Sequence, residues 1–466
     1  MLEFQELTVS AGAHLRPYYE MCIYRLCEYS LGVKLMWRGY LHPWFAEAAG
    51  CLIIRNCIEG EYVFDYPITG SEGDEEAALA AIEAYCGEKE LPLVLSVVPE
   101  EKAAGLVLRY PRVKVISERP WKDYLYRTED LAQFAGRRYS GQRNHINKFR
   151  RDYPDAAFVP LTDPKDPRLA AFWTSYEAEF HKTGPLAKEE LALAQEMFGL
   201  LDTGWFCAGG MLAEGRLVAV CLAEKCGDTL VNHIEKALYS HAGAYPAIVQ
   251  AFAAHYGGGC AWVNREDDAR DKGLRTSKLQ YLPAALGGKV RLEVGTELDM
   301  LRRVPTLKTE RLTLTALRPG DKEAYNALCL DDDRNRWWGY DYRTGLGDAP
   351  LTEDYFLDAA KADFAARRAV NFAVRLKGKL IGEVVLYRPD FRGGFEQGCR
   401  IAPAYAGHGY GTEAFAAAAD WALYHLGLAR VVAKCFKENA ASHKMLASCM
   451  RPSGEDETYF YFEKTV

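Results

Sequence analysis

The sequence predicts an α/β fold with mixed sheets, built as three similar units in tandem. Its 466 residues are too many for one hydrophobic core and correspond to about three domains. The second and third units repeat one order of elements, in which two hairpin strands and a third strand precede a crossover helix and a parallel fourth strand. The content of 49% hydrophobic and 26% charged residues is that of an ordinary globular protein.

Two boundaries divide the chain. The clearer one lies at 301–307, where a charged stretch ends and a new alternating strand begins. The softer one lies at 152–155, where a basic helical segment ends in a turn. We therefore expect domains at 1–150, 151–303 and 304–466.

The repeated elements follow from alternating apolar residues, turn residues and helical periodicity. In the second unit these patterns predict a strand, turn and strand over 204–223, a strand at 230–238, a helix at 244–256 and a strand at 261–264. In the third unit they predict strands at 371–376, 380–387 and 395–401, a helix at 412–426 and a strand at 430–436.

The segment 405–414, YAGHGYGTEA, places three glycines at alternate positions between a predicted strand and an alanine-rich helix. Glycine is costly inside regular elements, so the loop must need exposed backbone. A glycine loop that opens a helix is typical of an anion site, because free N–H groups converge where the helix dipole is positive. We expect Thr412 to cap the helix, with Glu413 in its first turn and apolar residues from Ala414 to His425 along one face. The spacing fits neither the dinucleotide loop nor the Walker loop.

From Leu307 to the C-terminus the chain resembles the GNAT superfamily of N-acetyltransferases, nearest its ribosomal-protein N-terminal acetyltransferase branch. Three segments carry the resemblance in the correct order: LKTERLTL at 307–314, FEQGCRIAPAYAGHGYGTEA at 395–414 and NAAS at 439–442. Two departures stand out. Ala406 lies where the family loop usually begins with Arg or Gln, and Met450-Arg451 replaces the usual Gly-Phe.

This resemblance implies acetyl-CoA, or another acyl-CoA, as co-substrate and a primary amine on a small molecule or peptide as acceptor. The amine attacks the thioester directly in a ternary complex, which requires positioning, a base and an acid for the leaving thiolate. Glu396 is the candidate base and Ser442 the candidate donor to the thiolate, although Glu396 can equally be a solvated strand residue and Ser442 a helix cap. The implied cofactor-binding residues are Ile401, Gly407, His408, Gly409, Tyr410, Gly411, Thr412 and Asn439.

Two polar segments stand out in the first 300 residues. Segment 137–151 has six Lys or Arg with interleaved aromatics, and it includes Arg143 and Asn144. It suits a phosphate-rich ligand, but a solvated basic helix has the same composition. Segment 262–283 follows a predicted strand with a dense polar loop, which either lines a site or forms a buried salt-bridge cluster. Its candidate residues are Asn264, Arg265, Arg275 and Lys278.

These two segments resemble a family related to the C-terminal domain of phosphatidylglycerol lysyltransferase, through RNHINKF at 143–149 and NRED with GLRTSK at 264–278. The resemblance implies two tandem GNAT-like domains, of which the first is degenerate, and makes tRNA a candidate partner because related enzymes use aminoacyl-tRNA. The counterpart of the glycine loop, at 238–245, has a single glycine.

Other features narrow the function classes. The net charge of −7 argues against a general nucleic-acid binder. No apolar run is long enough for a membrane span, and the N-terminus lacks a signal peptide, so we expect a cytoplasmic protein. The thirteen cysteines are scattered singly, which indicates reduced core residues and no metal site.

Three functions remain open: an acyl-CoA-dependent N-acetyltransferase, an aminoacyl-tRNA-dependent transferase run by the N-terminal pair, and a non-catalytic ligand-binding regulator. Aromatic segments at 337–342 and 459–462 are expected either to wall the acceptor cleft or to lie in the core.

Overall fold

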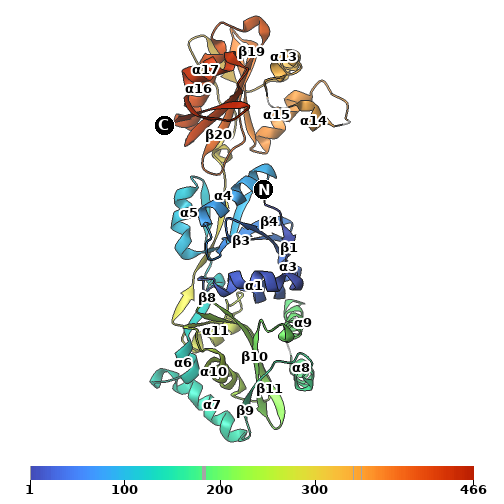
Figure 1. Ribbon diagram of the computed structural model, residues 1–466, viewed down its shortest axis with the longest axis vertical. Helices are drawn as coiled ribbons and strands as arrows, with labels where there is room; N and C mark the ends of the chain where they lie inside the picture. The colour runs from blue at the N-terminus through green and yellow to red at the C-terminus, as the bar shows by residue number, and fades with distance from the viewer. Residues whose placement is uncertain (1, 181–184, 339–340, 348) are drawn as a thin grey trace. The chain divides into compact units, whose positions relative to one another are not determined.

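The computed structural model (Figure 1) describes residues 2–180, 185–338, 341–347 and 349–466. Contacts within the chain define two units. One comprises Met1–Tyr85, Val94–Ala104 and Val115–Glu293, and the other Cys86–Leu93, Gly105–Lys114 and Val294–Val466. The described residues form three sheets of mixed strand direction, which confirms the predicted α/β class.

The first sheet has the strand order β1-β2-β3-β4-β6-β15-β7, with β5 paired to β3. The strands are β1 (Gln5–Glu6), β2 (Trp44–Ala48), β3 (Cys51–Ile58), β4 (Glu61–Asp65), β5 (Ile68–Thr69), β6 (Leu93–Pro99), β7 (Val113–Ile116) and β15 (Lys289–Val294). The helices in this part of the chain are α1 (Gly12–Glu20), α2 (Leu31–Met36), α3 (Arg38–Leu41), α4 (Glu75–Glu88) and α5 (Ala103–Arg109).

The second sheet has the order β14-β8-β13-β12-β11-β10-β9. Strand β11 buries every residue from 217 to 224, as expected for a strand covered on both faces, and Figure 1 shows α10 and α8 on opposite sides of it. The strands are β8 (Asp123–Arg127), β9 (Ala157–Pro160), β10 (Cys207–Ala213), β11 (Arg216–Cys226), β12 (Thr229–Ala237), β13 (Trp262–Asn264) and β14 (Ala285–Gly287). The helices are α6 (Thr128–Gln133), α7 (Ser140–Asp152), α8 (Pro167–Glu179), α9 (Pro185–Phe198), α10 (Ala244–Tyr256) and α11 (Lys272–Gln280).

The third sheet has the order β16-β17-β18-β19-β20-β21-β23-β22. The strands are β16 (Leu307–Lys308), β17 (Leu312–Thr315), β18 (Ala369–Leu376), β19 (Lys379–Tyr387), β20 (Gly394–Ile401), β21 (Arg430–Phe436), β22 (Arg451–Glu455) and β23 (Tyr459–Thr465). The helices are α12 (Lys322–Cys329), α13 (Asp332–Asn335), α14 (Tyr342–Leu346), α15 (Tyr355–Ala365), α16 (Tyr410–Trp421) and α17 (Ala440–Cys449).

Helix α16 packs on the core of the third sheet through the face that the sequence predicts. Ala414, Phe415 and Ala418 are fully buried against strand residues such as Phe372 and Val431. The prediction is wrong for His425, which is exposed. The helix continues into a π-helical turn at Ala422–Leu426, and this local change of pitch alters which residues face the sheet.

One layout recurs in all three sheets, and the two copies predicted from the sequence are confirmed. Three antiparallel strands lead through a crossover helix into a strand parallel to the third of them. The sets are β2-β3-β4 with α4 and β6, β10-β11-β12 with α10 and β13, and β18-β19-β20 with α16 and β21.

Sheet membership does not follow chain order at the predicted boundaries. Strand β8 precedes residue 150 yet belongs to the second sheet, and β15 precedes residue 303 yet belongs to the first. The division into domains at 1–150, 151–303 and 304–466 stays a prediction.

Candidate active site

Strands β20 and β21 part from each other in the middle of the third sheet. They pair in parallel only from Gly394 to Glu396, whose partner is Val432, although β20 runs on to Ile401 and β21 to Phe436. On its other edge β20 stays paired with β19 up to Ile401. Among the described residues, one edge of the β20 backbone beyond Glu396 therefore has no strand partner, and its N–H and C=O groups are available to a ligand.

The glycine loop lies at the end of β20 and leads directly into α16. Gly407, His408 and Gly409 are exposed, and both glycines have positive φ, +78° and +79°. Gly409 is the N-cap of α16 and carries no side chain to bond the first N–H groups. The prediction that Thr412 caps the helix is wrong, because the left-handed conformation of Gly409 lets the helix begin earlier, at Tyr410.

The other two crossover helices begin in different surroundings. Asp74 precedes α4 and accepts from the Ala77 N–H at 3.0 Å, and Glu75 and Glu76 make the first turn acidic. Before α10, a Cβ on Gly243 would lie 2.5 Å from the carbonyl oxygen of His145 on α7. By contrast, a Cβ on Gly407 would meet no atom of the described residues within 4 Å. Of the three helix starts, the third has the most open loop backbone, although Glu413 also places an acidic residue in its first turn.

Glu396 lies at the point where β20 and β21 diverge. The Tyr387 hydroxyl donates to Glu396 Oε1 at 2.7 Å, and Arg388 Nη1 donates to Oε2 at 3.2 Å. Tyr387 and Glu396 are direct partners in the pairing of β19 with β20. Sequence reasoning missed Tyr387, although counting back from the hairpin turn between these strands pairs it with Glu396.

Asn439 and Ser442 lie at the start of α17. Asn439 is the N-cap, and its side-chain oxygen accepts from the Ser442 backbone N–H at 3.1 Å. The cap is therefore Asn439 and not Ser442, and Ser442 is half-buried in the first turn.

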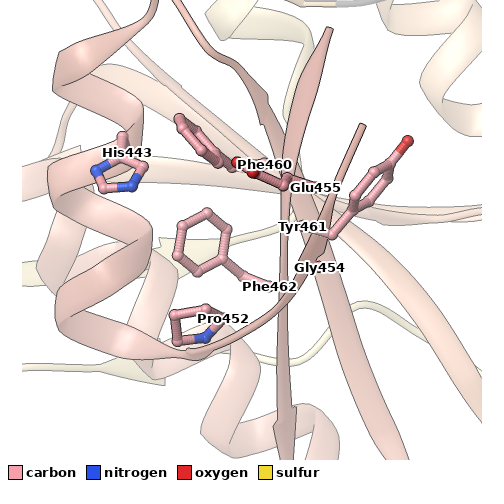
Figure 2. A pocket seen from close by; sticks show the side chains of 7 residues that line it. All are labelled: His443, Pro452, Gly454, Glu455, Phe460, Tyr461 and Phe462. Atoms are coloured by element: carbon pink, nitrogen blue, oxygen red, sulfur yellow. The ribbon is translucent and has the colours of Figure 1, made fainter. Parts of the chain in front are cut away.

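The aromatic segment at 459–462 divides between the two faces of the sheet. Phe460 and Phe462 pack against His443 of α17 and line a pocket of about 320 Å³, whereas Figure 2 shows the Tyr461 ring on the other side of the strand. The Tyr459 and Phe436 rings pack at a tilt of 47° with their centroids 4.6 Å apart, and the centroids of Phe436 and Trp337 are 5.6 Å apart. The rest of segment 337–342 includes residues 339 and 340, which lie outside the described residues.

The candidate residues at 264–278 meet at the end of β13. Buried Asn264 donates to Asp123 Oδ2 at 2.7 Å, and buried Arg265 pairs with Glu235, Nε to Oε1 at 2.9 Å. Lys278 Nζ donates to the carbonyl oxygen of Arg265 at 2.5 Å, and burial lowers the Lys278 pKa. Arg275 joins this group through its ion pair with Asp268, at 2.8 Å.

Arg143 and Asn144 are separate from that group. Arg143 Nη1 donates to the carbonyl oxygens of Phe134 and Gly136 beside the end of α6, and Asn144 is exposed. Helix α7 buries only Ile146 and Phe149, so the basic segment is a surface helix. Within the described residues, α7 reaches α11 through Gln142, which donates to the Gln280 carbonyl oxygen at 3.2 Å.

A buried histidine links the same loop to the sheet. His233 Nε2 lies 3.0 Å from Glu224 Oε1, and Nδ1 lies 3.0 Å from Glu266 Oε1. Glu224 Oε1 also accepts from the Gly32 N–H at 2.6 Å. Burial opposes protonation of the imidazole, but the hydrogen bonds to both carboxylates outweigh it and raise the pKa of His233 to about 9.

This pKa makes stability depend on pH. Because the folded pKa lies above the unfolded value of 6.5, the stabilisation is complete below pH 6.5, declines as pH rises, and is lost above about pH 9. The raised pKa of His233 corresponds to about 3 kcal/mol of folding free energy.

We expect the Tm of the wild-type protein, measured by calorimetry, to fall between pH 6.5 and 9. His233→Gln should start lower and lack that fall, while His145→Gln, on an exposed histidine, should behave as wild type. A fall of equal size in His233→Gln would contradict the assignment.

Cys27, Glu28 and Asp123 place ligand-type atoms close together, but a lysine already lies among them. Lys289 Nζ is 2.5 Å from Glu28 Oε1, 2.9 Å from Asp123 Oδ1 and 3.7 Å from Cys27 Sγ. The ammonium group balances these acids, as expected for a buried charge cluster.

Comparison with known proteins identifies two regions of the chain. The family model described as "Phosphatidylglycerol lysyltransferase, C-terminal" matches residues 24–289, more than half of the chain. The chain belongs to this family. The model described as "Acetyltransferase (GNAT) domain" matches residues 311–449, so this family member carries a GNAT domain as well. Both predicted resemblances are confirmed.

Individual relatives cover different parts of the chain. A conserved protein of unknown function from Bacteroides thetaiotaomicron is 26% identical, covers 63% of this chain and all of its own, and superposes with a TM-score of 0.58. A GNAT-family acetyltransferase from Bacillus anthracis is 22% identical over 34% of this chain and 98% of its own, with a TM-score of 0.30. An uncharacterized protein of Mycoplasmoides gallisepticum is 22% identical over 162 residues, which span 34% of this chain and about half (52%) of that relative.

Among the described residues, no helix combines the length and apolar character that crossing a membrane requires.

Proposed function

We propose that residues 304–466 bind acetyl-CoA, or another acyl-CoA, and transfer its acyl group to a primary amine. The observation that carries this proposal is the open glycine loop at the start of α16, directly beyond the gap between β20 and β21. The GNAT match at 311–449 covers both features. The loop residues 407–412 would hold the pyrophosphate, and the free β20 edge up to Ile401 would pair with the pantetheine amides.

In this proposal the protein acts by positioning and proton transfer. The amine nitrogen attacks the thioester carbonyl carbon, the C–S bond breaks, and the thiolate leaves. Glu396 accepts the amine proton, directly or through one water, while Tyr387 holds its carboxylate in place. Ser442 would donate a proton to the thiolate, and Asn439 would contact the pantetheine arm beside it. Tyr459 and Phe436 would wall the acceptor side.

The direct test is calorimetric titration of the full chain with acetyl-CoA, followed by a screen of amines, amino acids and peptide N-termini for release of free thiol. Saturable binding and amine-dependent thiol release would support the proposal. Binding without turnover on any amine would favour a non-catalytic acyl-CoA-binding protein. Absence of binding would overturn the proposal.

A second activity is proposed for residues 24–289, in keeping with their family: transfer of an aminoacyl group from aminoacyl-tRNA. The specific observation is the loop after β13, where Glu266, Ala269 and Arg270 all have positive φ. Strain of this kind collects at functional sites. Buried Arg265 has an Nη1 atom without a hydrogen-bond partner in the described chain, a polar group that the described contacts leave unsatisfied.

Binding of tRNA tests this second activity. If α7 contacts the phosphate backbone, Arg151→Glu, on a side chain 74% exposed, should weaken tRNA binding several-fold and leave acetyl-CoA binding unchanged. Arg151 tests tRNA contact more specifically than Arg143, because the Arg143 guanidinium already donates to main-chain carbonyl oxygens. Filter binding between 50 and about 500 mM salt should show a steep loss of affinity. Salt-independent binding, or none, would contradict the proposal.

A further inference from the structure

Arg311, in the turn between β16 and β17, lies against the glycine loop although about a hundred residues separate them in sequence. Arg311 Nη1 donates to the His408 carbonyl oxygen at 3.0 Å, and Nε donates to Glu413 Oε2 at 2.6 Å. Its guanidinium carbon is 4.7 Å from the centre of the Tyr410 ring. These contacts hold the guanidinium plane at residues 408–410, while 43% of the side chain stays exposed.

One edge of this guanidinium remains available. Nη2 lies 3.4 Å from the position that a Cβ on Gly409 would take, so it borders the open side of the loop. No hydrogen bond joins Nη2 to the part of the chain that the structure describes. A planar guanidinium with a free N–H edge is well suited to a phosphate oxygen.

The loop itself brings no cation. Residues 405–412 include no lysine or arginine, and the His408 Nδ1 is 2.8 Å from the Ala406 carbonyl oxygen. Glu413, in the first turn of α16, would repel a phosphate. Burial opposes its ionisation, but hydrogen bonds from Thr309 and Arg311 outweigh it and lower the pKa of Glu413. Arg311 therefore offsets this negative charge and adds a donor beside the loop.

We propose that Arg311 is the phosphate-binding side chain of the acyl-CoA site, with Nη2 donating to the pyrophosphate while Nη1 and Nε stay bonded to the loop. Arg311 lies in a distant segment of the sequence and provides a positive charge beside the loop. Ala406, at the start of the loop, has no charge to provide. This inference rests on the proposed acyl-CoA function and assigns a specific residue to it.

The test compares ligands with and without the pyrophosphate. Calorimetry on the full chain measures CoA, and competition against CoA measures pantetheine, which keeps the arm and lacks the phosphates. Arg311→Met should lower the affinity for CoA about tenfold to a hundredfold, which is the range for a hydrogen bond to a charged group. It should change the affinity for pantetheine by less than about twofold. Arg451→Met, on an exposed edge-strand arginine, is the matched control and should bind both as wild type.

A second variant separates ligand binding from loop support. Ala406→Arg, added to Arg311→Met, should recover most of the CoA affinity, because it returns a guanidinium to the exposed start of the loop. If Arg311→Met lowers the affinities for CoA and pantetheine equally, and Ala406→Arg does not restore them, the inference is overturned. Arg311 then has only a structural role. Unchanged CoA binding in Arg311→Met would also overturn it while the acyl-CoA function stands. If the wild-type protein fails to bind CoA, both proposals fall.

Discussion

Gly409→Asp is expected to weaken acetyl-CoA binding by at least about a hundredfold, because like charges placed in contact cost several kcal/mol. Gly409 is exposed at the start of α16 and has positive φ. Among the described residues, only Arg311 Nη2 lies near the place of a Cβ. A carboxylate there would face the pyrophosphate and compete for Arg311. Calorimetric titration with acetyl-CoA measures the loss.

Gly409→Asn is the matched control. Asparagine has nearly the same shape as aspartate, tolerates positive φ as well, and carries no charge. We expect it to weaken binding less than about tenfold. Gly378→Asp is a second control, since Gly378 has a similar φ of +84° and open surroundings in the β18–β19 turn. Equal affinities for the Asp and Asn variants would show that the loop does not hold the phosphates.

Glu396→Gln should lower kcat by about a hundredfold to ten-thousandfold, the usual contribution of a positioned general base. Glutamine keeps the size of the side chain and can accept from the Tyr387 hydroxyl, but it cannot take the amine proton. The affinity for acetyl-CoA should stay within about twofold of wild type, since the loop and the β20 edge are untouched. Steady-state rates with the amine found by the thiol screen measure the effect.

Glu463→Gln makes the same chemical change on β23, where Glu463 Oε1 lies 3.8 Å from Arg451 Nη2. This variant should leave kcat unchanged. A Glu396→Gln variant with kcat close to wild type would contradict the role of base. Glu396 would then be a strand residue whose carboxylate only bonds Tyr387 and Arg388.

The elements of the repeated layout could be predicted from the sequence. Helix α10 and strand β21 have the predicted bounds. Alternating and helical apolar patterns are local in the sequence, and glycines mark the turns that end such elements. Other predicted strands and the helix α16 differ from the structure by a few residues at their ends. Thr412 is a good cap by composition, but backbone geometry at Gly409 decides where α16 begins.

The candidate site was predictable only in part. The glycine loop, Glu396 and Asn439 are signalled by neighbouring residues in the sequence. Arg311 carries no such signal, because it reaches the loop through packing between distant segments, and Tyr387 is signalled only by its place opposite Glu396 in the β19–β20 hairpin. The polar segment at 264–278 shows the same limit. Its composition does not reveal that Arg265 binds Glu235 of β12 or that His233 lies between two carboxylates.

The sequence by itself determined the α/β class, the repeated order of strands and crossover helices, and the glycine loop before α16. Each of these depends on periodicity or on residues close together in the chain. Only the tertiary structure decided that this loop stays open, whereas α7 covers the start of α10, and that Arg311 lies beside Gly409. These features depend on contacts between segments far apart in sequence, and local patterns do not record which surfaces meet.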